Sequence, residues 1–351
     1  MFGALYRLFA VAFCVDFAVM AGTMGVPFFI YSQLGGGAGT SGVIGGVQAA
    51  CYAGACLLSA SLVSRAKNGL TWAALGIALF SVMGFLIPFS TSVFVCGALA
   101  VGSFMSLSLS WPALYAWIGA EPDVAVRGRN IARFNVAWSA SFVVSPLLAG
   151  PLFDWDYRMP FFMLGIVGVI AFLLTRSLPH ENAHYDAPPT PVPTDCSARD
   201  RVSDAHLYAS WCANFMTGLL ITNTRTVFPK RIDELVNAGE LRLLWEATPA
   251  SFLTSGAATK YSWLAAAIAF TMVMTFIWMG RNRGWHHRFS LLVWVQVFSA
   301  LAFWMLGRTH SLAVMMICFI LVGLGRAVTY FVSTDYSIAD PAFKHRRAAI
   351  N

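Results

Sequence analysis

Apolar residues occur along the chain in long runs, and short polar segments separate these runs. A helix needs about 20 mainly apolar residues to cross the hydrocarbon core of a bilayer. Inside hydrocarbon every backbone polar group must be satisfied within its own segment, so the runs are expected to be helices. The chain is therefore predicted to be an all-α polytopic membrane protein with about ten transmembrane helices. The predicted spans are 8–31, 41–63, 70–89, 93–118, 131–153, 159–175, 207–228, 261–280, 289–307 and 311–336.

One polar, proline-rich segment divides these spans into a group of six and a group of four. The predicted organisation is an N-terminal bundle at 1–176, a cytoplasmic linker at 177–206 and an incomplete C-terminal bundle at 207–351. An external insertion at 232–259 lies between the seventh and eighth spans. Its apolar residues either form a short helix on the membrane surface or belong to an ordinary structured loop; they are Leu235, Leu241, Leu244 and Trp245.

Composition and charge agree with a membrane protein. The chain is 58% hydrophobic and 11% charged, whereas soluble domains carry about 25% charged residues. The net charge of +7 comes from short basic clusters between apolar runs. Such clusters are typical of positive-inside loops and not of a nucleic-acid surface. Their distribution predicts a multi-pass protein of the cell (inner or plasma) membrane with a cytoplasmic N-terminus.

The fourth and tenth predicted spans align when the sequence is shifted by 219 residues. The aligned pairs are Trp111 with Tyr330, Trp117 with Tyr336, and Glu121-Pro122 with Asp340-Pro341. A basic cluster follows in both copies, and parallel repeats of this kind occur in secondary transporters. In the first half another apolar span comes next, whereas the second half stops at "AFKHRRAAIN". The repeat predicts that the chain is truncated just as an eleventh span begins.

Six spans, a long linker and a second set of spans that repeats the first resemble the Major Facilitator Superfamily. The resemblance implies two pseudo-symmetric helical bundles, with six and four helices here, around a cavity lined by spans one, four, seven and ten. The family's loop after span two reads G-x-x-x-D-R-x-G-R, and residues 60–68 align with it. Arg65 matches and Lys67 adds a second basic group, while Ser64 replaces the acidic residue. By resemblance, Arg65 and Lys67 are candidates for a gating loop.

A second stretch resembles a motif of antiporters in this family. "SPLLAGPLF" at 145–153 is similar to G-P-x-x-G-G, with Ser145 and Ala149 in place of glycines. These replacements favour a role in close helix packing over a role in exchange.

Two charged residues within the spans are candidates for transport, because a charge at the bilayer centre costs about 2.5–3.5 kcal/mol. Asp16 lies in the first span, and a carboxyl group that gains and loses a proton is the minimum requirement for proton coupling. A structural hydrogen bond is the alternative. Arg326 in the tenth span stays charged, so it needs a carboxylate, carbonyl groups or an anionic solute. The resemblance makes Asp16 and Arg326 partners, and a structural ion pair is the alternative for Arg326.

Aromatic and amide side chains supply the remaining candidates. Trp111 and Tyr115 lie four residues apart in "LSLSWPALYAW", where Pro112 is expected to kink the helix. Trp111 and Tyr330 would form two walls for an organic ring, although such residues also face lipid or a core.

Span seven adds polar candidates. Asn214 and Asn223 can hydrogen-bond to a solute. Arg225, near the outer end of the same span, is expected to anchor the helix at the membrane interface. Asp335, near the inner end of span ten, is expected to pair with Arg346 or Arg347.

These features predict a secondary transporter of a small solute that works by alternating access. Proton coupling through Asp16 is a subsidiary hypothesis. Solute, protons and bilayer are the expected partners of a monomer, with no nucleic acid, metal or cofactor. An enzyme is not expected, because no nucleophile–base set or metal cluster occurs in the spans or loops. Two alternatives stay open: a transporter-like receptor or assembly protein without flux, and a non-functional fragment of a twelve-helix transporter.

Overall fold

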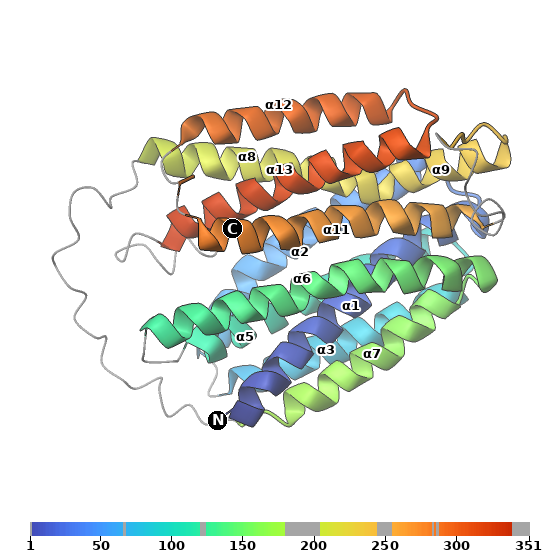
Figure 1. Ribbon diagram of the computed structural model, residues 1–351. Coiled ribbons are helices and arrows are strands. Elements are labelled where there is room, and N and C mark those ends of the chain that lie inside the picture. The colour runs from blue at the N-terminus through green and yellow to red at the C-terminus, as the bar shows by residue number, and fades with distance from the viewer. Residues whose placement is uncertain are drawn as a thin grey trace. The chain divides into compact units, whose positions relative to one another are not determined.

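The computed structural model describes residues 2–65, 68–119, 124–179, 204–243, 255–282, 284–285 and 288–338. Helices dominate these residues (Figure 1). They are α1 (Phe2–Ser32), α2 (Ala38–Arg65), α3 (Gly69–Leu86), the 3-10 helix η1 (Ile87–Phe89), α4 (Val93–Leu107), α5 (Ser110–Gly119), α6 (Val124–Trp155), α7 (Met159–Arg176), α8 (Asp204–Thr226), α9 (Phe228–Asn237), α11 (Ala257–Arg281), α12 (Phe289–Leu306) and α13 (Leu312–Ile338). Most of the predicted linker and the stretch after Ile338 lie outside the described residues.

Nine of the described helical segments are long and apolar enough to cross a membrane. Large apolar side chains such as Phe94, Ile166 and Trp304 point outward on these helices, as lipid-facing residues do. The seventh predicted span, 207–228, does form a helix, α8, but α8 is not among the nine. Its polar side chains, among them Asn214 and Asn223, lower its hydropathy. An all-helical, multi-pass membrane fold is confirmed.

The fourth predicted span is broken in the middle. The helix stops after Leu107 and starts again at Ser110. Pro112 explains the break, because it has no N–H to donate to the carbonyl of Ser108 and its ring crowds that carbonyl. The hydroxyl of Ser59 in α2 donates to the freed Ser108 oxygen instead, at 2.7 Å. Both serines are buried, so this hydrogen bond satisfies a group that the proline leaves without its helical partner.

Replacing Ser59 by Ala is expected to lower the free energy of unfolding by about 1–2 kcal/mol, because the buried Ser108 carbonyl loses its donor. In a Pro112→Ala background the same change should cost less than about 0.5 kcal/mol, since an alanine at position 112 can donate along the helix. Unfolding in mixed detergent by titration with sodium dodecyl sulfate measures both values. Equal costs in the two backgrounds would contradict this explanation of the break.

The helices gather into two compact units. Unit 1 comprises Met1–Asp186, Arg225–Ala238 and Pro249–Ala266, and so includes the end of α8 and the start of α11. In it α1 packs against α6 and α7, and α3 packs against α4 and α7 (Figure 1). The ring of Phe29 in α1 stacks on Tyr157 at 5.6 Å and meets Phe161 edge-on at 5.8 Å. Small residues allow the close approach of helices, as at Gly76, where a Cβ atom would overlap the Ser106 carbonyl of α4.

Unit 2 comprises Ala187–Thr224, Gly239–Thr248 and Ala267–Asn351. Here α12 packs against α13. A buried apolar cluster joins residues of α8, α11, α12 and α13, with Leu207, Met279 and Val328 among its members. Unlike its counterpart in the sequence repeat, α13 is continuous. The residue aligned with Pro112 is Phe331, which keeps the backbone N–H that a helix needs. The boundaries of the N-terminal bundle, linker and C-terminal bundle that the sequence suggests stay a prediction.

The first residues of the predicted insertion at 232–259 belong to an amphipathic helix, α9 (Phe228–Asn237). Its apolar side chains Phe228, Ile232 and Leu235 are buried, and the helix contacts α1. This apolar face therefore packs on protein in unit 1 and not on the membrane surface. Leu241 lies beyond the end of α9, next to the isolated β-bridge of Arg242 with Ser311. The other two residues of the predicted apolar face, Leu244 and Trp245, lie outside the described residues.

Candidate functional site

Asp16 is buried in the middle of α1, with only 6% of its surface exposed. No described residue hydrogen-bonds to its carboxylate or forms an ion pair with it. The cation whose charge acts on Asp16 is Arg225, and we refer to these two residues as the charge pair. A buried carboxylate is stable only with such compensation. The pairing of Asp16 with Arg326, which the family resemblance suggests, stays a prediction.

Arg225 lies at the end of α8 and is half-buried within unit 1. Its guanidinium group sits over the ring of Phe142 in α6, 5.4 Å from the ring centroid. Nearby in unit 1, the buried Tyr261 of α11 meets Phe28 of α1 with ring centroids 5.9 Å apart. An interface anchor would instead extend its charge toward water. The contact of Arg225 with Phe142 is that of a cation over an aromatic ring.

Arg225→Gln is expected to lower the free energy of unfolding by about 1–3 kcal/mol, because it leaves the Asp16 carboxylate buried without its cation. The double variant Asp16→Asn with Arg225→Gln should recover at least about 1 kcal/mol of that loss. Arg281→Gln, which removes an exposed arginine, is the matched control and should change stability by less than about 0.5 kcal/mol. Additive single-variant costs in the double variant would show that the two charges do not interact.

An aromatic cluster joins α5 and α6 in unit 1. Trp111 and Tyr115 lie side by side with ring centroids 6.3 Å apart. Both rings meet the fully buried Phe134 edge-on, at 6.2 and 5.2 Å. Next to Phe134, the side-chain oxygen of Asn135 accepts a hydrogen bond from the indole N–H of Trp138 at 2.9 Å. The aromatic cluster thus carries one amide at its edge.

The aromatic cluster continues toward the charge pair along one face of α6. The ring of Trp138 meets Phe142 at 5.4 Å, and Phe142 in turn lies under Arg225. Asn135, Trp138 and Phe142 are spaced three and four residues apart, so they share one face of the helix. This face connects the start of the predicted fifth span with the charge pair.

In unit 2 the structure brings together three of the predicted site residues. The Nη1 atom of Arg326 donates to the backbone oxygen of Asn214 at 3.2 Å and to its side-chain oxygen at 2.5 Å. The Arg326 guanidinium lies over the ring of Tyr330, 5.3 Å from its centroid. Beside them, the hydroxyl groups of Thr217 and Thr329 form a hydrogen bond of 2.7 Å between α8 and α13.

Two predicted groups do not join these clusters. Asn223 is exposed, and its side-chain N–H donates to the Leu219 oxygen of its own helix at 3.0 Å. Arg65 is the last residue of α2, and Lys67 lies outside the described residues. Their proposed gating role stays a prediction.

Residues of α6 and α11 form a polar clasp in unit 1. The Asp154 carboxylate accepts hydrogen bonds from the backbone N–H and the hydroxyl of Thr259, at 2.9 and 2.5 Å, and so caps the start of α11. A Cβ atom at Gly256 would overlap this carboxylate, and one at Gly150 would overlap the Ala258 oxygen. We call Asp154, Thr259 and Gly256 the α6–α11 clasp.

Ser145, in the motif that resembles the antiporter stretch, also makes a contact between helices. Its buried hydroxyl donates to the Phe17 oxygen of α1 at 2.7 Å. This agrees with the expected role of the motif in helix packing.

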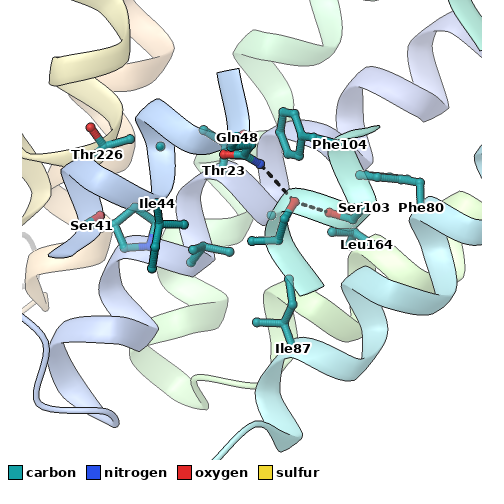
Figure 2. A pocket seen from close by; sticks show the side chains of 15 residues that line it. Thr23, Ser41, Ile44, Gln48, Phe80, Ile87, Ser103, Phe104, Leu164 and Thr226 are labelled. Atoms are coloured by element: carbon teal, nitrogen blue, oxygen red, sulfur yellow. Dashed lines mark hydrogen bonds between the residues drawn. The ribbon is translucent and has the colours of Figure 1, made fainter. Parts of the chain in front are cut away.

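A small cavity lies between α1, α2, α3 and α4 in unit 1 (Figure 2). Its volume is about 30 Å³, which accommodates one or two water molecules and no organic solute. Figure 2 shows the side chains of Gln48 and Ser103, which both donate to the Ala100 oxygen, at 3.3 and 2.8 Å. This cavity is therefore too small to bind an organic solute in this conformation.

Comparison with known proteins identifies the family. The sequence profile of the Major Facilitator Superfamily matches residues 8–350. The chain belongs to the Major Facilitator Superfamily. This membership confirms the resemblance that the spans, linker and repeat suggest.

The chain is also similar to a curated protein and to several solved structures. The quinolone resistance protein NorA of Staphylococcus aureus is 24% identical over 107 residues, which are 30% of this chain and 28% of NorA. The match thus spans little more than a quarter of that relative. Among solved structures, a peptide transporter POT in complex with sulfate has a TM-score of 0.74 at 14% identity, over 99% of this chain and 85% of the other.

A bacterial homolog of the human lysosomal transporter Spinster has a TM-score of 0.68 at 15% identity, over 98% of this chain and 78% of the other. At these identities the two structures establish the fold alone.

Sequence reasoning missed four residues that the structure adds to the candidate site, Asn135, Trp138, Phe142 and Tyr261, and it gave Arg225 a different role. The spacing of the three α6 residues was a detectable signal, since polar and aromatic residues recur there on one helical face. Which neighbouring helix that face meets is decided by packing and is not encoded in the spacing.

Proposed function

We propose that this chain is a secondary transporter that moves a small organic solute across the membrane by alternating access. The observation that carries the proposal is the charge pair, because ionisable residues inside membrane spans usually mark a transport pathway. Superfamily membership and the fold of the solved transporters support it. The proposed orientation has the N-terminus in the cytoplasm, and the proposed active form is a monomer.

We propose that Asp16 couples transport to protons. In its charged form the carboxylate attracts Arg225; once protonated, it no longer does so. Arg225 then moves relative to α1, and the hydrogen bonds around it change. Proton binding would thereby bias one conformation over the other, as a coupling ion must do.

Solute contacts are proposed for residues of both units. Trp111 and Tyr115 offer aromatic faces to an organic ring. In unit 2 Arg326 and Asn214 offer hydrogen-bond donors, and Tyr330 offers a further ring. Asn223 stays a candidate, because its exposed amide can exchange its bond to Leu219 for one to a solute.

We propose that the α6–α11 clasp forms part of a gate on the outer side and that Arg65 and Lys67 belong to a gate on the inner side. In the conformation described here the clasp is closed. Alternating access requires it to open, so the two hydrogen bonds of Asp154 must break in each cycle.

The proposal is tested by a flux assay on proteoliposomes that contain the full-length protein. The relative NorA is named for quinolone resistance, so a fluorescent quinolone is the first solute to test. Accumulation is measured with and without a pH gradient across the vesicle membrane and compared with empty vesicles. Saturable accumulation that depends on the gradient is expected. Binding of the solute without counterflow would instead favour a receptor that carries no flux.

A further inference from the structure

The side-chain amide of Asn135 has a fixed orientation within the aromatic cluster. Its oxygen accepts from the indole N–H of Trp138 at 2.9 Å and more weakly from the Tyr115 hydroxyl at 3.4 Å. An indole N–H can only donate. The atom of Asn135 that faces Trp138 must therefore be the oxygen, and the NH₂ group must point the other way.

The NH₂ group of Asn135 offers two hydrogen-bond donors that the described part of the chain does not use. No described residue accepts a hydrogen bond from it. The side chain is half-buried, and its neighbours Trp111, Tyr115 and Phe134 present aromatic rings. An amide donor beside aromatic rings binds a compound that combines a ring with an acceptor oxygen. It does not bind an ammonium group, which has only donors.

The position of Asn135 gives a solute access to it. Tyr115, whose hydroxyl lies 3.4 Å from the Asn135 side-chain oxygen, is 37% exposed. Asn135 lies two residues after Arg133, where the fifth membrane span begins. The amide therefore lies near one end of the span and is only half-buried, and the face of α6 that follows it leads to the charge pair.

We propose that Asn135 is a solute-binding residue that donates a hydrogen bond to a carbonyl or carboxylate oxygen of an aromatic compound. The inference rests on the proposed transport function and specifies the class of solute. Trp138 is a positioning residue in this site. Its indole N–H binds the amide oxygen of Asn135, so the NH₂ group of Asn135 is oriented toward the solute. Trp111 and Tyr115 supply the ring contacts.

Two probes of similar shape test the proposal by equilibrium dialysis against the purified full-length protein in detergent. 2-Naphthoate carries acceptor oxygens, and 2-naphthylmethylammonium carries only donors. The wild type should bind 2-naphthoate about tenfold more tightly than Asn135→Leu does, since one hydrogen bond to a charged acceptor is lost. The matched control Asn282→Leu changes an exposed asparagine in unit 2 and should bind like the wild type.

Two further variants separate a binding role from a structural one. Asn135→Asp keeps an acceptor oxygen for Trp138 and Tyr115 but replaces the NH₂ donors by a negatively charged oxygen. It should therefore bind 2-naphthoate more than tenfold more weakly than the wild type and the ammonium probe more tightly. Trp138→Phe frees the amide to rotate, so the ratio of the two affinities should approach one. The changed preference of Asn135→Asp for the two probes can be measured even if Asn135→Leu does not fold.

The proposal would be overturned if wild type, Asn135→Leu and Asn135→Asp bound 2-naphthoate within twofold of one another. Binding in detergent requires no flux. If the variants bind 2-naphthoate like the wild type while the flux assay shows gradient-driven accumulation, Asn135 is not a solute-binding residue but the transport function stands. If binding depends on Asn135 while the flux assay shows no accumulation, the binding site stands and the transport function is rejected.

Discussion

Asp16→Asn is expected to reduce gradient-driven accumulation in the flux assay at least tenfold. Asparagine has the shape of a protonated aspartate, but it neither releases a proton nor attracts Arg225 as a carboxylate does. The variant should therefore behave as a permanently protonated form, which can still alternate but cannot release a proton. Exchange of labelled for unlabelled solute at equal pH on both sides moves no net protons, so it should continue at a rate within a few-fold of the wild type.

The matched control is Asp156→Asn, which changes an aspartate that lies just after α6 and outside the spans. The Asp156 carboxylate accepts from the backbone N–H of Arg158 at 2.9 Å, and Asn can accept the same bond. This control should accumulate solute like the wild type. Full gradient-driven accumulation by Asp16→Asn would exclude Asp16 as the coupling residue. Loss of both accumulation and exchange would assign Asp16 a structural role instead.

Opening the α6–α11 clasp is expected to shift the conformational equilibrium about tenfold toward a form that is open on the outer side. Asp154→Ala removes both hydrogen bonds to Thr259, and loss of a helix cap costs about 1–2 kcal/mol, which corresponds to roughly tenfold or more. Gly256→Ala should act in the same direction, because its methyl group would displace the carboxylate. Distances between spin labels at the C-terminal end of α6 and the N-terminal end of α11 measure the two populations.

Asp156→Ala is the control for the clasp. It removes a carboxylate two residues from Asp154 whose hydrogen bond stays within its own loop. Its distance distribution should match that of the wild type. If Asp154→Ala and Gly256→Ala also leave the distribution unchanged, the clasp stabilises the folded protein and takes no part in gating.

Several parts of the fold could be predicted because they depend on local sequence. The apolar runs predict the helices, and Pro112 predicts the break between α4 and α5, since a missing N–H acts within one turn. The partner of the freed carbonyl, Ser59, could not be predicted, because it belongs to a different helix. For the insertion at 232–259 the sequence left a helix on the membrane surface and a structured loop as alternatives, because an amphipathic pattern shows that one face is buried but not which part of the protein or membrane covers it.

In the candidate site, too, the residue types could be predicted from the sequence, whereas their contacts between helices could not. Asp16 and Arg326 were found because charges are rare within apolar spans. Asn214 was found as a polar residue of α8, and its contact with Arg326 came only from the packing of α8 on α13. Arg225 was predicted to be an interface anchor because it lies near the end of a span. That position does not show that its guanidinium group contacts the ring of Phe142 on α6. Asn135 is an ordinary residue in the sequence, and only its hydrogen bond to Trp138 gives its amide a direction.

Coupling of solute movement to protons through the charge pair can be measured directly. The internal pH of proteoliposomes is recorded with a trapped pH-sensitive dye while a solute gradient is imposed at equal starting pH. With wild-type protein, the solute should drive a saturable proton movement that Asp16→Asn abolishes. Solute flux that moves no protons in the wild type, or an equal proton movement in Asp16→Asn, would contradict coupling through the charge pair.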